Sequence, residues 1–430
     1  ETPMLTRSTP EGARDYVVPS RVHPGAFYAL PQTPQIFKQI FMVAGFDRDM
    51  QVVRCFRDES LRADRQPEFT QLDLELACVH EEDVIDVVER LVKSLVKELM
   101  GVEITEAFPR LGYREALDRF GTDRPDQRYD LELVDITDLA AEMGFRVFQS
   151  ACEAGGRVRG LCLRGGARMS RKEITELEAG LQDQGAKGLA WVKRTAEGAT
   201  GPLGRFLGGE GGARLFERMG AAPADLLLFV ADDKPAIVDA SLAQLRSLIA
   251  EREGLIEGDQ LRFLWVNDFP LFEWSEEEGR PKPCHHPFTS PREEDLERLE
   301  EDPLGVRALA YDLVLNGAEI AGGSIRIHTH AIQEKVFRAI GIGQEEAQAK
   351  FQFLLEALRY GAPPHGGIAI GIDRLAMELL GVSSIREVIP FPKTQRGVCP
   401  LTGAPATVSG EQLAELHLSL EPAAEGSSGR

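Results

Sequence analysis

The chain has 430 residues and a formal net charge of −20, from 49 Lys and Arg against 69 Asp and Glu. Its length exceeds one typical domain, so we expect a large domain with an insertion or a second domain. The acidic balance argues against nonspecific coating of nucleic acid. Six cysteines without CxxC spacing argue against zinc and fit a reducing, intracellular setting. Because no apolar run reaches the ~20 residues that cross a bilayer, we expect no membrane association and a cytoplasmic location.

The N-terminal region, residues 1–80, is rich in strand and turn patterns. The chain starts with Glu1 rather than Met, and we take it to be part of a longer protein. One helix is expected from Pro34 to Phe46, because proline suits a first helical turn. Its polar face carries Gln35, Lys38 and Gln39.

The most informative stretch runs from Cys55 to Leu76 and predicts two antiparallel strands separated by a charged loop. In the second strand, leucines alternate with polar residues, which is the period of a half-buried strand. Arginines that face carboxylates and an amide suit a ligand carrying both charges, such as an amino acid beside a polyphosphate. A solvated hairpin with surface salt bridges fits the pattern equally well. The alternating residues are Gln71, Leu72, Asp73, Leu74, Glu75 and Leu76.

Residues 81–100 predict an amphipathic helix that packs against the sheet. After residue 126, glycine-rich turns alternate with strand-like and helical segments, so we place an inserted α/β domain at 127–258. A run of cations in it has no acidic residue between its members. The simpler interpretation is that these cations lie on a solvated face, and the more specific one is that they contact an RNA backbone. The cations are Arg157, Arg159, Arg164, Arg168, Arg171 and Lys172.

Strand-like segments with candidate catalytic residues resume at 259–422. Residues 423–430 form a polar tail that we expect to be disordered. Asp312 and Glu319 flank an Asn-Gly turn and could hold Mg²⁺ that bridges phosphates, although ordinary hairpin carboxylates are commoner. Past a glycine-rich bend, Arg326 could clamp a substrate carboxylate.

Two neighbouring histidines, His285 and His286, point to opposite sides of an extended chain and have no third metal ligand nearby. We therefore prefer His285 as a substrate-contacting loop residue over a metal site.

The segment Ile368–Arg374 predicts a strand that turns through Gly371 into a helix. Glycine permits the close approach of a flat ligand, and Arg374 lies near a helix N-terminus, where anions are favoured. A buried junction capped by Asp373 is the alternative. The sequence holds no GxxxxGK[ST] loop and no convincing GxGxxG. A faint class I lysine–serine pattern at 168–171 lacks its histidine–glycine partner.

Together these segments resemble the bacterial-type aspartyl-tRNA synthetases, a class II family, over residues 1 to about 420. Residues 1–3 are similar to the end of motif 1, 56–75 to motif 2 and 371–374 to motif 3. The segments 9–15, 65–71 and 285–289 strengthen the resemblance, and the last indicates the aspartate branch. The implied fold is α+β, an antiparallel sheet flanked by helices. In this fold 1–126 and 259–422 form the catalytic domain around the insertion.

The resemblance implies adenylation of L-aspartate by ATP, with release of pyrophosphate, and transfer to the 3′ end of tRNA(Asp). It implies a homodimer in the intact protein, whose motif 1 helix and anticodon-binding barrel precede residue 1. The implied catalytic residues are Arg57 and Arg374, and the Mg²⁺ ligands are Asp312 and Glu319. The implied aspartate-binding residues are Glu11, Gln35, Lys38, Arg57, Asp73, His285 and Arg326. The implied ATP-binding residues are Arg57, Asp58, Glu59, Gln66, Phe69, Glu319, Gly371, Ile372, Asp373 and Arg374.

Two other functions stay open. A paralogue of the asparagine-synthetase type would adenylate aspartate without tRNA, and the insertion argues against it. A regulatory binding module with an inactive site is opposed by the intact Arg57, Asp312 and Arg374.

Overall fold

The computed structural model describes residues 1–9, 12–256, 258 and 260–421. The expected role of Glu11 and the expected disorder of 423–430 lie outside these residues. The chain divides into two compact units. The first comprises Glu1–Ala107, Phe269–Asp312 and Ile320–Arg430, and the second comprises Phe108–Asp268 and Leu313–Glu319. The domain boundaries at 127 and 258 were inferred from composition and stay a prediction.

The largest sheet has seven strands in the order β3-β4-β16-β15-β14-β11-β5. β4 pairs antiparallel with β3 and β16, and β16 with β15, whereas β11 and β5 are parallel. This mixed α+β architecture, with a mainly antiparallel sheet and flanking helices, confirms the predicted fold class. The strands are β3 (Arg48–Phe56), β4 (Glu68–Ala77), β5 (Arg110–Gly112), β11 (Phe263–Asn267), β14 (Ala310–Leu315), β15 (Ala318–Ile325) and β16 (His365–Gly371).

The predicted hairpin is confirmed, because β3 and β4 pair with Cys55 opposite Phe69. The burial of the two faces of β4 differs from the expected pattern, in which the leucines would be the buried residues. The polar residues Asp73 and Glu75 are 1% and 0% exposed, whereas Leu72 and Leu76 are only partly buried. The polar side of β4 therefore faces an interior, where charges persist only when they are paired.

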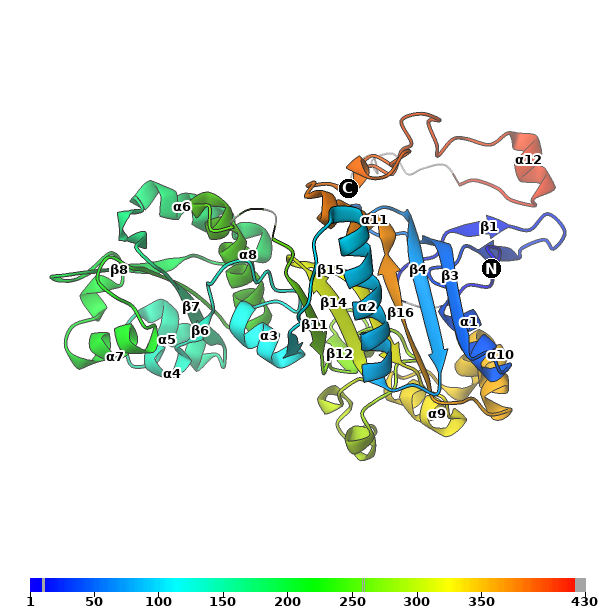
Figure 1. The fold of residues 1–430 in the computed structure, drawn as a ribbon, viewed down its shortest axis with the longest axis horizontal. Helices are drawn as coiled ribbons and strands as arrows, with labels where there is room; N and C mark the ends of the chain where they lie inside the picture. The colour runs from blue at the N-terminus through cyan, green and yellow to red at the C-terminus, as the bar shows by residue number, and fades with distance from the viewer. Residues whose placement is uncertain (10–11, 257, 259, 422–430) are drawn as a thin grey trace. The chain divides into compact units, whose positions relative to one another are not determined.

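Within the first unit, α2 packs against β16 and α11 against β4 (Figure 1). The predicted first helix is α1 (Gln35–Val43), shorter than expected because Gly45 takes a φ of +90°. The predicted α2 (Glu81–Met100) is confirmed and ends at Gly101 in the left-handed conformation. The other helices are α9 (His330–Ala339), α10 (Gln344–Arg359), α11 (Ile372–Leu380) and α12 (Gly410–Glu415).

Two small hairpins complete the strands of the first unit: β1 (Val17–Pro19) with β2 (Phe27–Ala29), and β12 (Phe272–Ser275) with β13 (Arg280–Pro283). Across the described residues, we find no helix whose length and hydropathy would let it cross a membrane.

The turn before β15 is confirmed, because Asn316 and Gly317 both have positive φ, +53° and +91°. The glycine-rich bend expected after it is wrong, since β15 continues through Gly322 and Gly323. A Cβ on Gly323 would lie 2.4 Å from the carbonyl oxygen of Gly367. This glycine therefore serves close packing of neighbouring strands rather than a bend.

The second unit contains a five-stranded antiparallel sheet in the order β6-β7-β10-β8-β9, with a core on each face. Successive side chains of β10 point to opposite faces of the sheet, so they contribute to different cores. Leu226 and Leu228 belong to one core, and Leu227 and Phe229 belong to the other. The strands are β6 (Val134–Asp135), β7 (Arg157–Leu163), β8 (Ala190–Thr195), β9 (Gly198–Thr200) and β10 (Leu226–Asp232). The helices are α3 (Tyr113–Phe120), α4 (Thr137–Ala140), α5 (Arg146–Glu153), α6 (Arg171–Ala179), α7 (Glu210–Arg218) and α8 (Pro235–Glu253).

The expected contact of the cations at 157–172 with RNA stays a prediction, but several of these cations have partners within the unit. Arg159 is 1% exposed and bonds to Asp239 rather than to a ligand. Three other cations of the run pair with carboxylates that are distant in sequence. These pairs are Arg157–Asp135, Arg164–Asp225 and Arg168–Glu253.

Candidate active site

A buried ionic cluster lies where α1 meets the polar side of β4. Lys38 reaches from α1, and its Nζ lies 2.6 Å from Asp73 Oδ1 and 3.4 Å from Glu75 Oε2. Arg326 follows the end of β15 and joins from the other side. These four side chains are at most 3% exposed. The cluster is neutral in sum, because two cations meet two carboxylates.

Arg326 is held by every nitrogen of its guanidinium. Its Nε and Nη2 donate to the two oxygens of Glu75 at 3.0 and 3.1 Å, which is the strong bidentate geometry. Its Nη1 donates to Ser324 Oγ and lies 3.0 Å from His286 Nε2. The orientation of this arginine is therefore fixed before any ligand arrives.

Burial and the neighbouring charges shift the pKa values of the titratable groups in and beside the cluster. Burial raises the pKa of Asp73, although Lys38 opposes it. Burial acts in the same direction on Glu75, but Arg326 and Lys38 outweigh it and lower the pKa of that carboxyl. Burial and the nearby Arg326 lower the pKa of His286 well below its usual range. His286 is therefore neutral in the folded protein.

We expect His286 to make the folded state acid-sensitive. Its folded pKa is lowered, so the unfolded chain binds the extra proton, and stability falls as pH drops below about 6.5, the usual histidine value. Urea unfolding midpoints measured between pH 5 and 8 test this. The His286→Gln variant, which keeps an acceptor but cannot titrate in this range, should lose less stability on acidification than the unchanged protein. Parallel curves would contradict the prediction.

Several buried polar atoms of Asp73 and of α1 have unused hydrogen-bonding capacity. Within the described part of the chain, Asp73 Oδ2, Gln35 Nε2 and both amide atoms of Gln39 are buried without a hydrogen-bond partner. Burying such an atom without a partner costs about 1–3 kcal/mol. The cluster thus offers an acceptor and donors to a ligand that carries an ammonium and a carboxylate.

Arg57 and Phe69 lie at the two ends of the loop between β3 and β4. The Arg57 guanidinium stands 5.2 Å from the centre of the Phe69 ring, and its backbone N–H donates to Pro67 O. A half-buried cation beside an aromatic face suits a nucleotide phosphate next to a flat base.

The segments similar to motifs 2 and 3 meet through Asp373, whose Oδ2 accepts the Thr70 N–H at 2.9 Å. Asp373 therefore does not cap its own helix, where Gly371 is the N-cap residue. A Cβ on Gly371 would make only ordinary contacts, with Arg374 Cβ and Ile320 O at 3.8 Å, so packing alone does not require glycine here. Arg374 Nη2 lies 3.4 Å from Asp64 Oδ2.

Other residues expected to bind ATP have protein partners in the described chain. Asp58 pairs with Arg14 at 3.6 Å, and Glu59 with Arg65 at 2.8 Å. The Gln66 amide bonds to the backbone of Lys393. Their contacts with ATP stay predictions.

His285 and His286 occupy different surroundings. His285 Nε2 lies 3.7 Å from Asp312 Oδ1, and its ring packs edge-on against Phe269. The sequence singled out His285 for the aspartate, whereas His286 is the histidine that contacts Arg326. Asp312 on β14 belongs to the first unit and Glu319 on β15 to the second.

Glu75 of the cluster and two neighbours of Arg326, His286 and Ser324, were not among the expected site residues. Glu75 had a readable signal, because a strand period of two places it on the same face as Asp73. Ser324 likewise precedes Arg326 by two residues. The contact of His286 with Arg326 depends on how strands remote in sequence are arranged, so the local sequence gives no signal for it.

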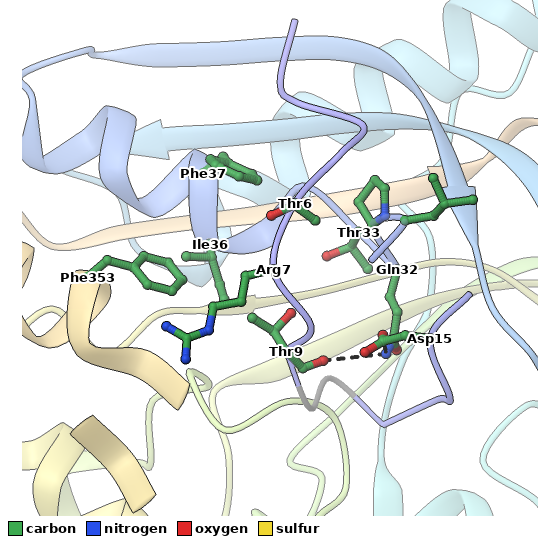
Figure 2. Close-up of a pocket in the computed structure, with 11 residues that line it drawn as sticks. Thr6, Arg7, Thr9, Asp15, Gln32, Thr33, Ile36, Phe37 and Phe353 are labelled. Carbon is green, nitrogen blue, oxygen red and sulfur yellow. Dashed lines mark hydrogen bonds between the residues drawn. The ribbon is translucent and has the colours of Figure 1, made fainter. Parts of the chain in front are cut away.

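A small pocket adjoins the N-terminal segment, shown in Figure 2 with Gln32 and Asp15 near Thr9. Gln32 is 3% exposed, and its Nε2 donates to Asp15 Oδ1 at 2.6 Å and to Ala13 O at 2.8 Å. Gln32 thereby anchors the residues next to position 11, where the resemblance places an aspartate contact.

Comparisons with known proteins cover the whole site. Residues 1–395 match the family model described as tRNA synthetases class II (D, K and N). The chain is 55% identical to the aspartate–tRNA(Asp/Asn) ligase of Aquifex aeolicus, over 98% of this chain and 71% of that protein. It is 56% identical to the protein of the same name from Moorella thermoacetica, over 97% and 70%. It is 54% identical to the aspartate–tRNA ligase of Halalkalibacterium halodurans, over 98% and 71%.

Proposed function

Since this chain belongs to the class II tRNA synthetases of the D, K and N group, we propose that it is an aspartate–tRNA ligase. It activates L-aspartate with ATP to aspartyl-adenylate, releases pyrophosphate, and transfers aspartate to the 3′ end of tRNA(Asp). The observation that carries this proposal is the buried cluster of Lys38, Asp73, Glu75 and Arg326.

The cluster suits a dicarboxylic amino acid. We infer that Lys38 and Arg326 neutralise the side-chain carboxylate of aspartate, and that Asp73 Oδ2 accepts its ammonium group. The amide of asparagine would lack the charge that these buried cations bind, and a site built in this way rejects the wrong ligand strongly. Arg326 is already fixed by Glu75 and Ser324, so little ordering is needed on binding.

In the chemical step, the aspartate α-carboxylate attacks the α-phosphate of ATP in line and pyrophosphate leaves. A carboxylate is already a nucleophile, so no general base is required. We assign Arg57 to the α-phosphate and the attacking carboxylate, where it offsets repulsion between two anions. Phe69 and Arg374 hold the adenine from its two faces.

Asp312 and Glu319 are the residues that would hold Mg²⁺. Carboxylate oxygens fit this ion, which takes one or two of them and completes its shell with phosphates and water. In the part of the chain that is described, no group of three or more His, Cys, Asp or Glu side chains could form a metal cage. When bound, the ion supplies charge neutralisation of the phosphates.

We also propose that the protein forms a homodimer. β3 is the edge strand of its sheet, and Met50 and Val52 on it are 71% and 67% exposed. The β1–β2 hairpin adds Val17 at 58% and Phe27 at 46%. An edge strand with exposed apolar side chains is usually covered in the native assembly. A second copy is the occupant that we infer. The cytoplasmic location stays a prediction.

Two assays test the function. We expect ATP–pyrophosphate exchange that requires L-aspartate and that asparagine does not support. We then expect charging of tRNA(Asp), with tRNA(Asn) assayed in parallel because some relatives are named aspartate–tRNA(Asp/Asn) ligase and others aspartate–tRNA ligase. Exchange without charging of any tRNA would favour the asparagine-synthetase-like alternative. No exchange with aspartate would refute the proposal.

A further inference from the structure

The loop between β3 and β4, residues 57–67, is held by a segment more than 300 residues later in the chain. The Ile385 N–H donates to Ala63 O at 2.9 Å, and Arg386 Nη2 reaches Arg62 O. Both contacts lie near the middle of the loop. Segment 385–393, which we call the clasp, thus spans the loop from its middle to its end.

Lys393 makes the tightest contacts of the clasp. Its backbone N–H donates to Gln66 Oε1 at 2.7 Å, and its carbonyl accepts from Gln66 Nε2 at 3.2 Å. The amide of Gln66, which is 6% exposed, thereby pairs with a backbone as a neighbouring strand would. Arg386 Nε also donates to the Lys393 carbonyl, at 3.1 Å. The position of Lys393 is therefore fixed by Gln66 of the loop and by Arg386 of the clasp.

The side chain of Lys393 forms a second link. Its Nζ lies 2.5 Å from Glu68 Oε1, and this hydrogen bond lowers the pKa of Glu68. Glu68 directly precedes Phe69 and also pairs with Arg54 of β3 at 2.7 Å. The ion pair therefore acts on the residues that set where Phe69 and Arg57 stand relative to each other.

We propose that Lys393 is a positioning residue for ATP. It fixes the end of the β3–β4 loop through Gln66 and Glu68 and so keeps Arg57 and Phe69 in the geometry that binds the nucleotide. The aspartate cluster has no contact with the clasp among these bonds, so its affinity should not depend on Lys393. This inference rests on the proposed function of Arg57 and Phe69.

The test uses the full chain with Lys393→Met in ATP–pyrophosphate exchange. Loss of a charge-assisted hydrogen bond predicts a KM for ATP about fivefold to tenfold higher, with the KM for aspartate changed less than about twofold. Lys393→Arg, which can still pair with Glu68, should restore the KM for ATP. Hydrogen exchange of residues 57–67 should be faster in Lys393→Met than in the unchanged protein.

Lys350→Met is the matched control, because it removes a 2.6 Å ion pair with Glu346 on α10, away from the loop. It should change neither KM nor exchange in the loop. An unchanged KM for ATP in Lys393→Met, or an equal rise of both KM values, overturns the inference. If the unchanged protein shows no aspartate-dependent exchange, the proposed function fails instead, and hydrogen exchange still decides whether Lys393 holds the loop.

Discussion

Replacing Arg326 with methionine is expected to reduce aspartate-dependent ATP–pyrophosphate exchange by about a thousandfold. The change removes the cation that we assign to the substrate carboxylate. It also leaves Glu75, which is 0% exposed, without its bidentate partner. Lys38 Nζ still lies 3.4 Å from Glu75 Oε2, but removing one partner of a buried ion pair costs up to about 3–5 kcal/mol, so the free energy of unfolding should fall as well. Exchange kinetics and urea unfolding measure the two effects separately.

A double variant separates catalysis from stability. In Arg326→Met with Glu75→Met, both partners of the buried pair become apolar, and such replacements are often neutral for stability. We expect the double variant to unfold close to the unchanged protein but to remain inactive in exchange. Recovery of exchange together with stability would show that Arg326 serves only to neutralise Glu75. Arg338→Met is a control, because its pair with Glu300 is exposed.

The sequence predicts the scaffold of the site well, and the physical reason is periodicity. The alternation at 71–76 and the stripe of α2 are local patterns that tertiary packing only reinforces. The Asn316-Gly317 turn follows in the same way from its two residues. By contrast, Gly323 was interpreted as a bend because glycine has two uses, and only the neighbouring strand shows that packing is the one here.

The sequence does not predict which charges meet. The cations at 157–172 are basic in sequence, but β7, α8 and their neighbours bring Asp135, Asp225 and Asp239 to them. Likewise, Glu75 and Arg326 are 251 residues apart and form the bidentate pair of the site. Contacts between remote strands depend on topology, and local pattern carries no information about them.

Replacing Arg57 with alanine is expected to lower the kcat of exchange by about a hundredfold to a thousandfold or more while leaving the fold intact. Arg57 is half-buried beside the Phe69 ring. Removing its side chain should therefore cost little stability, below about 1 kcal/mol. The loss of a cation that bridges two reacting anions acts on the transition state, where a preorganised charge is worth about a hundredfold to a thousandfold or more in rate.

The measurements are kcat and KM for ATP and aspartate, together with the thermal unfolding midpoint. We expect kcat to fall far more than the KM for aspartate rises, because Lys38 and Arg326 still bind the side-chain carboxylate.

Arg90→Ala is the matched control. It removes an exposed arginine of α2 that pairs with Asp86, and such surface pairs contribute little. Arg57→Lys should recover only part of the rate, because a single ammonium cannot contact phosphate and carboxylate in the planar geometry of a guanidinium. An unchanged kcat in Arg57→Ala would remove this residue from the chemical step and shift the stabilising charge to Arg374 or to the metal ion.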